Sequence, residues 1–128
     1  MRQSVIQALK EAKNATCRFE GQSIVRVNDS VINVRTATQK AGLKYWFDVT
    51  PSFYGFVHFF LFACGNASTV YVFPASELQH LIEGASLGGQ KQVPNFTIFS
   101  GTNELEPAGL VGTRKPISQY LNAYALIP

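Results

Sequence analysis

Along the first fourteen residues, hydrophobic positions recur at helical spacing, and beyond them they recur at alternate positions. The helical stripe consists of Val5, Ile6, Leu9 and Ala12. Three short segments rich in β-branched residues follow, CRFEG, SIVRVN and VINVRT, punctuated by Gly21 and by the turn composition NDS. The pattern predicts one amphipathic helix and then three strands, of which the second and third form a hairpin.

A two-residue loop in this hairpin would place alternate residues of both strands on common faces. One face would be polar and basic and would contain Gln22, Ile24, Arg26, Val31, Asn33 and Arg35. The opposite face would pack against the core and the N-terminal helix, and it would contain Val25, Val27, Ile32 and Val34. A three-residue loop with a bulge would break this correspondence.

Later segments continue with apolar strands and a second helix. LKYWFDV, residues 43–49, predicts a strand, and GFVHFFLFAC, apolar on both faces, predicts a central strand covered from two sides. STVYVF predicts the next strand. It leads into PASELQHLIEG, a helix for which Ser76 and Gln79 predict a capping box and Gly84 a C-terminal cap.

The last third of the chain has weaker patterns. Residues 84–95 are rich in glycine and polar residues and predict a mobile loop, FTIFS predicts an edge strand, and residues 101–115 show no period. Pro116 then starts a predicted terminal helix whose apolar face contains Ile117, Tyr120, Leu121 and Tyr124. The order of elements predicts an α+β fold with a mixed, mostly antiparallel central sheet flanked by helices.

Composition indicates a single folded domain over residues 1–128, as a monomer or a homodimer. The chain is 46% hydrophobic and 15% charged, which argues against disorder. Its longest apolar run is too short to span a bilayer, and its N-terminus lacks the pattern of a signal peptide. We therefore expect a cytoplasmic protein without membrane association. Cys17 and Cys64 match neither a disulfide framework nor a zinc spacing, which predicts buried, reduced thiols.

Charge is distributed unevenly along the chain. Residues 1–44 carry eight basic and three acidic side chains, whereas residues 45–128 carry three basic and five acidic ones. A basic N-terminal half indicates an anionic partner there, with an ordinary solvated surface as the alternative.

The segments VINVRTA, YWFDV, FVHFFLFAC and VYVFPASEL, in this order after a helix, resemble the restriction-endonuclease-like superfamily, the PD-(D/E)XK nucleases. The closing ISQYLNAYALI is also similar to the C-terminal segment of small members. The resemblance covers most of residues 1–83 and part of the tail, and it implies a restriction-endonuclease-like fold.

In that family an acid and a lysine of the (D/E)XK strand, an aspartate on the preceding strand and often a glutamate on the first helix hold divalent metal ions. These ions activate water against a phosphodiester. The resemblance places the four positions at Asn33, Arg35, near Gln22 and at Glu11. Asn33 and Gln22 carry no charge, and Arg35 keeps its proton and cannot act as a general base. Glu20 stands close enough to replace the missing acid if Gly21 does not bend the strand.

These departures favour a degenerate, non-catalytic domain that needs no cofactor and binds DNA or RNA through its basic sheet face. The candidate nucleic-acid-binding residues are Lys10, Lys13, Arg18, Gln22, Arg26 and Arg35. The first alternative is an active Mg²⁺-dependent endonuclease with Glu11 and Glu20 as metal ligands. The second is a self-associating or partner-binding accessory protein.

Two residues have competing interpretations. Arg35 belongs either to an anion site or to an ordinary sheet surface, where it would pair with Glu11 or Glu20. Trp46 shares a strand face with Lys44 and Asp48, so it either stacks on a base or belongs to the core or a dimer interface.

Overall fold

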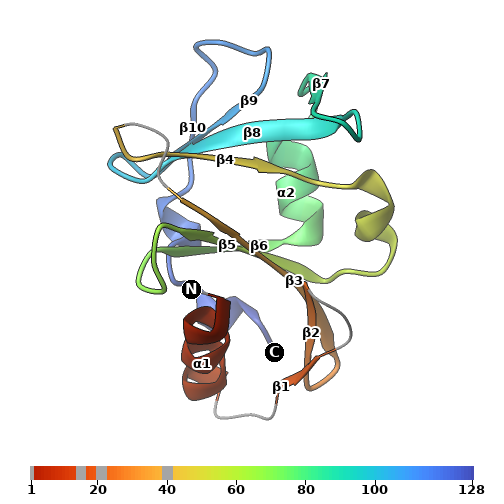
Figure 1. Ribbon diagram of the computed structural model, residues 1–128, viewed down its shortest axis with the longest axis vertical. Helices are drawn as coiled ribbons and strands as arrows, with labels where there is room; N and C mark the ends of the chain where they lie inside the picture. The colour runs from red at the N-terminus through yellow and green to blue at the C-terminus, as the bar shows by residue number, and fades with distance from the viewer. Residues whose placement is uncertain (1, 14–16, 20–22, 39–41) are drawn as a thin grey trace.

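The structure, a computed structural model, describes residues 2–13, 17–19, 23–38 and 42–128. Two sheets and two helices form the fold (Figure 1). The helices are α1 (Arg2–Lys13) and α2 (Ala75–Leu81), and three 3₁₀ turns are η1 (Pro51–Gly55), η2 (Ser118–Tyr120) and η3 (Tyr124–Leu126). The strands are β1 (Cys17–Phe19), β2 (Ile24–Val27), β3 (Ser30–Ala37), β4 (Lys44–Asp48), β5 (Phe59–Cys64), β6 (Val70–Pro74), β7 (Leu87–Gly88), β8 (Val93–Phe99), β9 (Glu104–Pro107) and β10 (Lys115–Pro116).

The first sheet has the strand order β1-β2-β3-β5-β6, and the second has the order β10-β9-β8-β4, with β7 paired to β8. Among the described strands, every pair is antiparallel except β3 with β5, which run parallel. In Figure 1, α1 covers one side of the first sheet, and the second sheet and α2 lie on its other side. The predicted α+β class with a mixed, mostly antiparallel sheet is confirmed, but two sheets are present instead of one.

One hydrophobic core lies between α1 and the first sheet. Val5, Ile6 and Leu9 of α1 are buried in one cluster with the four valine and isoleucine residues of the hairpin, Val25, Val27, Ile32 and Val34. The pairing of Val27 with Ser30 leaves a two-residue loop, Asn28–Asp29. Both the predicted loop and the predicted apolar face are therefore confirmed.

A second, aromatic core fills the space between the two sheets. Phe62 of β5 is fully buried, and its ring lies 4.7 Å from that of Phe47 on β4 and 5.2 Å from that of Phe96 on β8, between ring centroids. The other face of β5 contributes Leu61 to the α1 core. Strand β5 is thus covered from both sides, as its apolar sequence predicts.

The hairpin face predicted to be polar and basic is covered by this second core. Val31 is 7% exposed and Asn33 2% exposed, and Asn33 pairs with Phe60 of the neighbouring β5. The prediction of an open basic face is wrong at these positions because the same face continues into phenylalanine side chains that pack under the second sheet. Gln22 lies outside the described residues.

The C-terminal third departs most from the predictions. The predicted helix after Pro116 is replaced by η2 and η3, because Asn122 has a positive φ of 51° and its backbone N–H donates to the carbonyl of Val70 at 2.6 Å. This segment follows the edge of β6, where Leu121 bridges to Tyr71. Strand β8 lies inside the second sheet and is not an edge strand.

Smaller differences concern the connections. Residues 101–115, predicted to be irregular, include β9 and the first residue of β10, and the predicted loop at 84–95 includes β7 and the start of β8. Helix α2 begins directly after Pro74, without a side-chain capping hydrogen bond, so the predicted capping box is wrong. Cys64 is buried as a free thiol, as expected. Within the described part of the chain, no helix combines the length and apolar character needed to cross a membrane.

Burial of tyrosine side chains predicts a loss of stability in strongly alkaline solution. Burial raises the pKa of Tyr54, Tyr71 and Tyr120 from 10.0 to about 12. Between these values the unfolded chain loses phenolic protons that the folded chain retains, so the free energy of unfolding falls as pH rises above 10. Urea unfolding at pH 8 and pH 11 should show a lower midpoint at pH 11. In parallel, absorbance at 295 nm should show phenolates forming at lower pH in urea than in buffer; coincident titrations would contradict the prediction.

Candidate functional site

Arg35 lies near the end of β3, where the first sheet meets the end of β4. Its guanidinium donates from Nη2 to Oδ1 of Asp48 at 3.0 Å and from Nη1 to the backbone oxygen of Asp48 at 3.2 Å. The two side chains are 34% and 22% exposed, so one side of the ion pair faces solvent. Arg35 therefore pairs with Asp48, and not with Glu11; Glu20 lies outside the described residues.

Asn33 shares the face of Arg35, as the spacing of two residues predicts, but it is buried. Its Nδ2 donates to the backbone oxygen of Ser23 at 3.2 Å and to the Ser23 hydroxyl at 3.1 Å. These bonds satisfy the amide donors and hold the start of β2 against β3. Asn33 is thus a structural residue at the position that the resemblance gives to the metal-binding acid.

The structure does not bring Glu11 to Asn33 and Arg35. Glu11 belongs to α1, where its carboxylate accepts a hydrogen bond from Gln7 at 3.1 Å, and α1 packs on the opposite side of the first sheet. Among the described residues, His, Cys, Asp and Glu side chains nowhere gather in a group of three able to hold a metal ion. A metal centre at the four resemblance positions would need ligands on both sides of one sheet.

The basic residues predicted to bind nucleic acid are also divided between the two sides. Lys10 and Lys13 occupy the last turn of α1, on one side of the first sheet. Arg26 pairs with Val31 in the β2–β3 ladder, on the strand face of Asn33, and it also stands opposite Arg18 in the β1–β2 ladder. Arg35, near the end of β3, lies apart from these residues and contacts Asp48 of the second sheet.

The structure brings together another set of side chains on β4, an edge strand of the second sheet. Lys44, Trp46 and Asp48 point outward, while Tyr45 and Phe47 are buried. Alternate residues of a strand stand about 7 Å apart, and Asp48 holds Arg35 at the end of this row. We call these four residues, Arg35, Lys44, Trp46 and Asp48, the β4 strip.

Trp46 is the centre of the β4 strip and is 41% exposed. The indole Nε1 donates to Oδ1 of Asn95 at 3.2 Å, and Nδ2 of Asn95 donates to the backbone oxygen of Ser86 at 3.2 Å. Because Asn95 is only 9% exposed, this buried link fixes the orientation of the ring. At this exposure Trp46 is not part of the core, which leaves base stacking and a dimer interface as its two interpretations.

Beyond the β4 strip, the outer face of the second sheet carries both positively and negatively charged side chains. The Arg114 guanidinium carbon lies 3.7 Å from the centroid of Phe99, and Arg114 approaches Glu104 and Glu106 at 3.8 and 3.9 Å. Asp48 likewise offsets the charge of Arg35, so Lys44 is the basic side chain of the β4 strip that has no ion pair among the described residues. The alternation in LKYWFDV predicted the shared face of Lys44, Trp46 and Asp48, whereas Asn95 and Arg114 come from segments predicted to be a mobile loop and an irregular segment.

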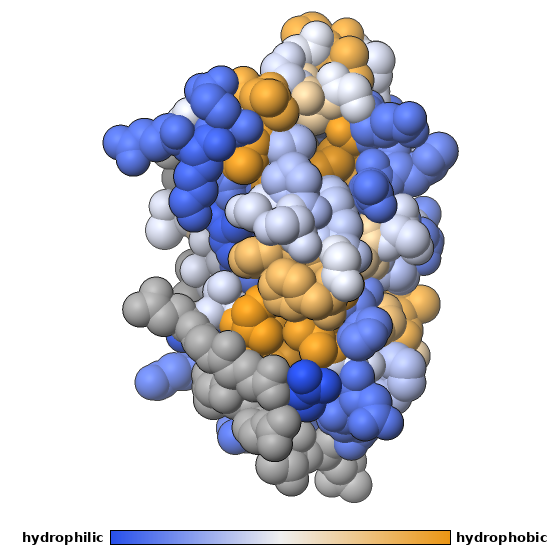
Figure 2. Space-filling view, turned by 90° about the vertical axis from the view of Figure 1, so that its right-hand side faces the viewer, coloured by the Kyte–Doolittle hydropathy of each residue, from blue (hydrophilic) through white to orange (hydrophobic). Residues whose placement is uncertain are grey.

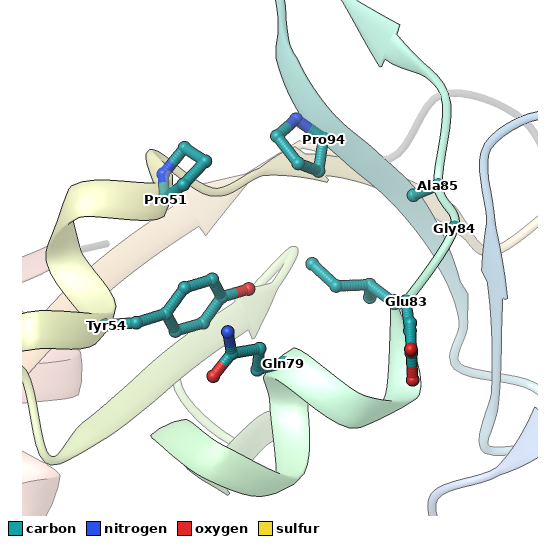
Figure 3. A pocket seen from close by; sticks show the side chains of 8 residues that line it. Pro51, Tyr54, Gln79, Glu83, Gly84, Ala85 and Pro94 are labelled. Atoms are coloured by element: carbon teal, nitrogen blue, oxygen red, sulfur yellow. The ribbon is translucent and has the colours of Figure 1, made fainter.

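A pocket of about 320 Å³ opens between η1, α2 and the start of β8 (Figure 3). It is lined by Pro51, Tyr54, Gln79, Ile82, Glu83, Gly84, Ala85 and Pro94. Figure 2 shows the side of the molecule on which η1 lies, where hydrophobic and weakly polar side chains form a band between hydrophilic ones. Sequence analysis missed this pocket because it joins two connections whose positions depend on how the sheets stack.

Comparison of the chain with protein-family models found no match, and comparisons with curated proteins and with solved structures found none either.

Proposed function

We propose that this chain is a non-catalytic domain that binds single-stranded DNA or RNA along the β4 strip, on a restriction-endonuclease-like framework. The observation that carries the proposal is the exposed, oriented indole of Trp46 next to Lys44 on one face of β4, with the Arg35–Asp48 ion pair at the end of the row. Bases stack on exposed aromatic rings whatever their sequence, and neighbouring cations bind the phosphates. A strand lying along β4 would meet the Trp46 ring and the Lys44 ammonium at neighbouring positions of one face, about 7 Å apart along the strand.

The restriction-endonuclease-like framework is supported by the order and direction of the elements. Strand β3, which carries VINVRTA, forms an antiparallel hairpin with β2 and lies parallel to β5. Strand β6 then passes through Pro74 directly into α2. This is the succession of segments on which the resemblance rests.

The placement of the three described resemblance positions, Glu11, Asn33 and Arg35, supports binding without catalysis. The Asn33 amide donates a hydrogen bond to Ser23, and Arg35 forms an ion pair with Asp48. Glu11 lies on the opposite side of the first sheet. A guanidinium keeps its proton at working pH, so Arg35 supplies positive charge and hydrogen-bond donors instead of a general base.

The central test measures binding of short labelled single strands by fluorescence anisotropy. Replacing Trp46 by alanine should weaken binding about 10- to 100-fold, because stacking on an aromatic side chain is worth about 1–3 kcal/mol per base. Trp46→Phe should retain most of the affinity. Since Trp46 is the single tryptophan of the chain, a bound strand should also quench the intrinsic tryptophan fluorescence.

Controls separate stacking from general loss of structure or charge. Phe56, an aromatic residue that is 50% exposed on the connection after η1, provides a matched variant, and Phe56→Ala should bind as the parent does. Lys44→Gln should weaken binding of all sequences alike and reduce the salt dependence by about one counterion. Equal affinity of Trp46→Ala and the parent would refute the proposed site. Strand fragments on a denaturing gel after incubation with Mg²⁺ would favour the endonuclease alternative.

A further inference from the structure

The pocket beside α2 has apolar walls and a polar floor. Tyr54 forms one wall, and its ring packs edge-on against the ring of Phe60, with 5.8 Å between centroids, which fixes it from behind. Ile82, Pro51 and Pro94 supply further apolar surface. In Figure 3, the Tyr54 hydroxyl and the Gln79 amide both point into the space between η1 and α2.

Both of these polar groups are available to a ligand. Within the described part of the chain, neither the Tyr54 hydroxyl nor the Gln79 side chain makes a hydrogen bond or an ion pair. Burial raises the pKa of Tyr54 to about 12, so the neutral hydroxyl remains a hydrogen-bond donor throughout the neutral range. An aromatic wall next to an uncommitted amide is suited to a planar ligand that carries both donors and acceptors.

We infer that this pocket binds an adenine base, with Gln79 hydrogen-bonded to the base edge and Tyr54 packed against the ring. A glutamine amide matches adenine in two bonds, accepting from the 6-amino group and donating to N7. The volume of about 320 Å³ is at the lower end of the range of small-molecule pockets, which suits one base better than a larger ligand. Glu83 at the pocket wall adds negative charge, which disfavours a phosphate group at this position.

The pocket is joined to the β4 strip through Asn95. Pro94 and Ala85 line the pocket, and each precedes a residue of the hydrogen-bonded link, Asn95 and Ser86 respectively. Asn95 in turn orients Trp46. A base in the pocket would therefore contact the segments that position the Trp46 ring. The base belongs either to a free nucleoside or to a strand held on the β4 strip, and only the second case rests on the proposed function.

The test measures binding of adenosine and inosine to the whole chain by isothermal titration calorimetry. Inosine has an oxygen in place of the 6-amino group, so it should bind about tenfold more weakly than adenosine. Gln79→Leu should weaken adenosine binding by about the same factor and remove the difference between the two nucleosides. Gln7→Leu makes the same replacement on α1, at an exposed position on the far side of the first sheet. It should leave the binding of both nucleosides unchanged.

Three results would overturn the inference: no adenosine binding at millimolar concentration, equal affinities for adenosine and inosine, or unchanged binding by Gln79→Leu. Oligoadenylate and oligouridylate then distinguish the two sources of the base. We expect the parent to prefer oligoadenylate if one strand binds at both sites. In that case Gln79→Leu should lose the preference, whereas Trp46→Ala should weaken the binding of both oligomers. Strand binding that does not respond to Gln79→Leu, together with no adenosine binding, would leave the proposed function standing and remove this inference. Adenosine binding without strand binding would support this inference and refute the proposed function.

Discussion

Replacing Phe62 by alanine is expected to lower the free energy of unfolding by about 3–5 kcal/mol, the cost of a large cavity in a buried core. Phe62 is fully buried on β5, and its ring contacts those of Phe47, Phe60, Phe73 and Phe96. Phe47 and Phe96 belong to the second sheet, so removing the ring removes contacts that hold the two sheets together. Thermal and urea unfolding measure the loss, which should lower Tm by roughly 10–20 °C.

Two further variants make the Phe62 result specific. Phe56→Ala removes the same ring from a position that is 50% exposed, and its effect should stay within about 0.5–1 kcal/mol. Phe62→Leu keeps much of the apolar volume and should fall between the parent and Phe62→Ala. A Phe62→Ala variant as stable as Phe56→Ala would contradict the packing of the two sheets described here.

The N-terminal half of the fold could be predicted because its packing follows from local periodicity. The stripe of Val5, Ile6 and Leu9 and the alternation of Val25, Val27, Ile32 and Val34 each bury one face, and the two faces meet in one core. The turn at Asn28–Asp29 fixes the register of the hairpin. In such segments the spacing of apolar residues determines which side chains are buried.

The C-terminal part illustrates where this reasoning fails. Ile117, Tyr120 and Tyr124 have helical spacing, yet Ile117 and Tyr120 pack into the core between the sheets, whereas Tyr124 packs into the core beneath α1. The segment crosses the edge of the first sheet, and its apolar residues serve two cores instead of one helix face. Such a path depends on pairing with β6, about fifty residues earlier in the chain, which local patterns do not encode.

In the candidate site, too, local periodicity predicts some features and tertiary packing determines the others. The shared face of Asn33 and Arg35, and that of Lys44, Trp46 and Asp48, follow from the two-residue period of a strand. The partners of these residues do not follow from it, because the contact between Arg35 and Asp48 exists only once the second sheet is stacked on the first. The sequence therefore identified the polar residues, and the structure shows which of them form hydrogen bonds or ion pairs within the fold.

Replacing Asn33 by aspartate would restore the acid of the nuclease motif, and it is expected to destabilise the protein by about 3 kcal/mol or more at neutral pH. Asn33 is 2% exposed, and its Nδ2 donates to two oxygens of Ser23. A carboxylate would bring negative charge against those oxygens without a donor, and burial would raise the pKa of the new carboxyl above its value in the unfolded chain. The destabilisation should therefore grow as pH rises and shrink in acid, where the protonated carboxyl can donate to Ser23.

Urea unfolding at pH 4.5 and pH 7.5 measures this dependence, with Asn66→Asp as the matched control. Asn66 is exposed, and its side chain accepts a hydrogen bond from the backbone N–H of Ser68, which a carboxylate can also accept, so this variant should differ little from the parent. Adding Mg²⁺ should not rescue Asn33→Asp, because Glu11 lies across the sheet from position 33. Stability equal to that of Asn66→Asp, or recovery on addition of Mg²⁺, would mean that position 33 accepts a charged ligand and would make the metal-dependent endonuclease the better hypothesis.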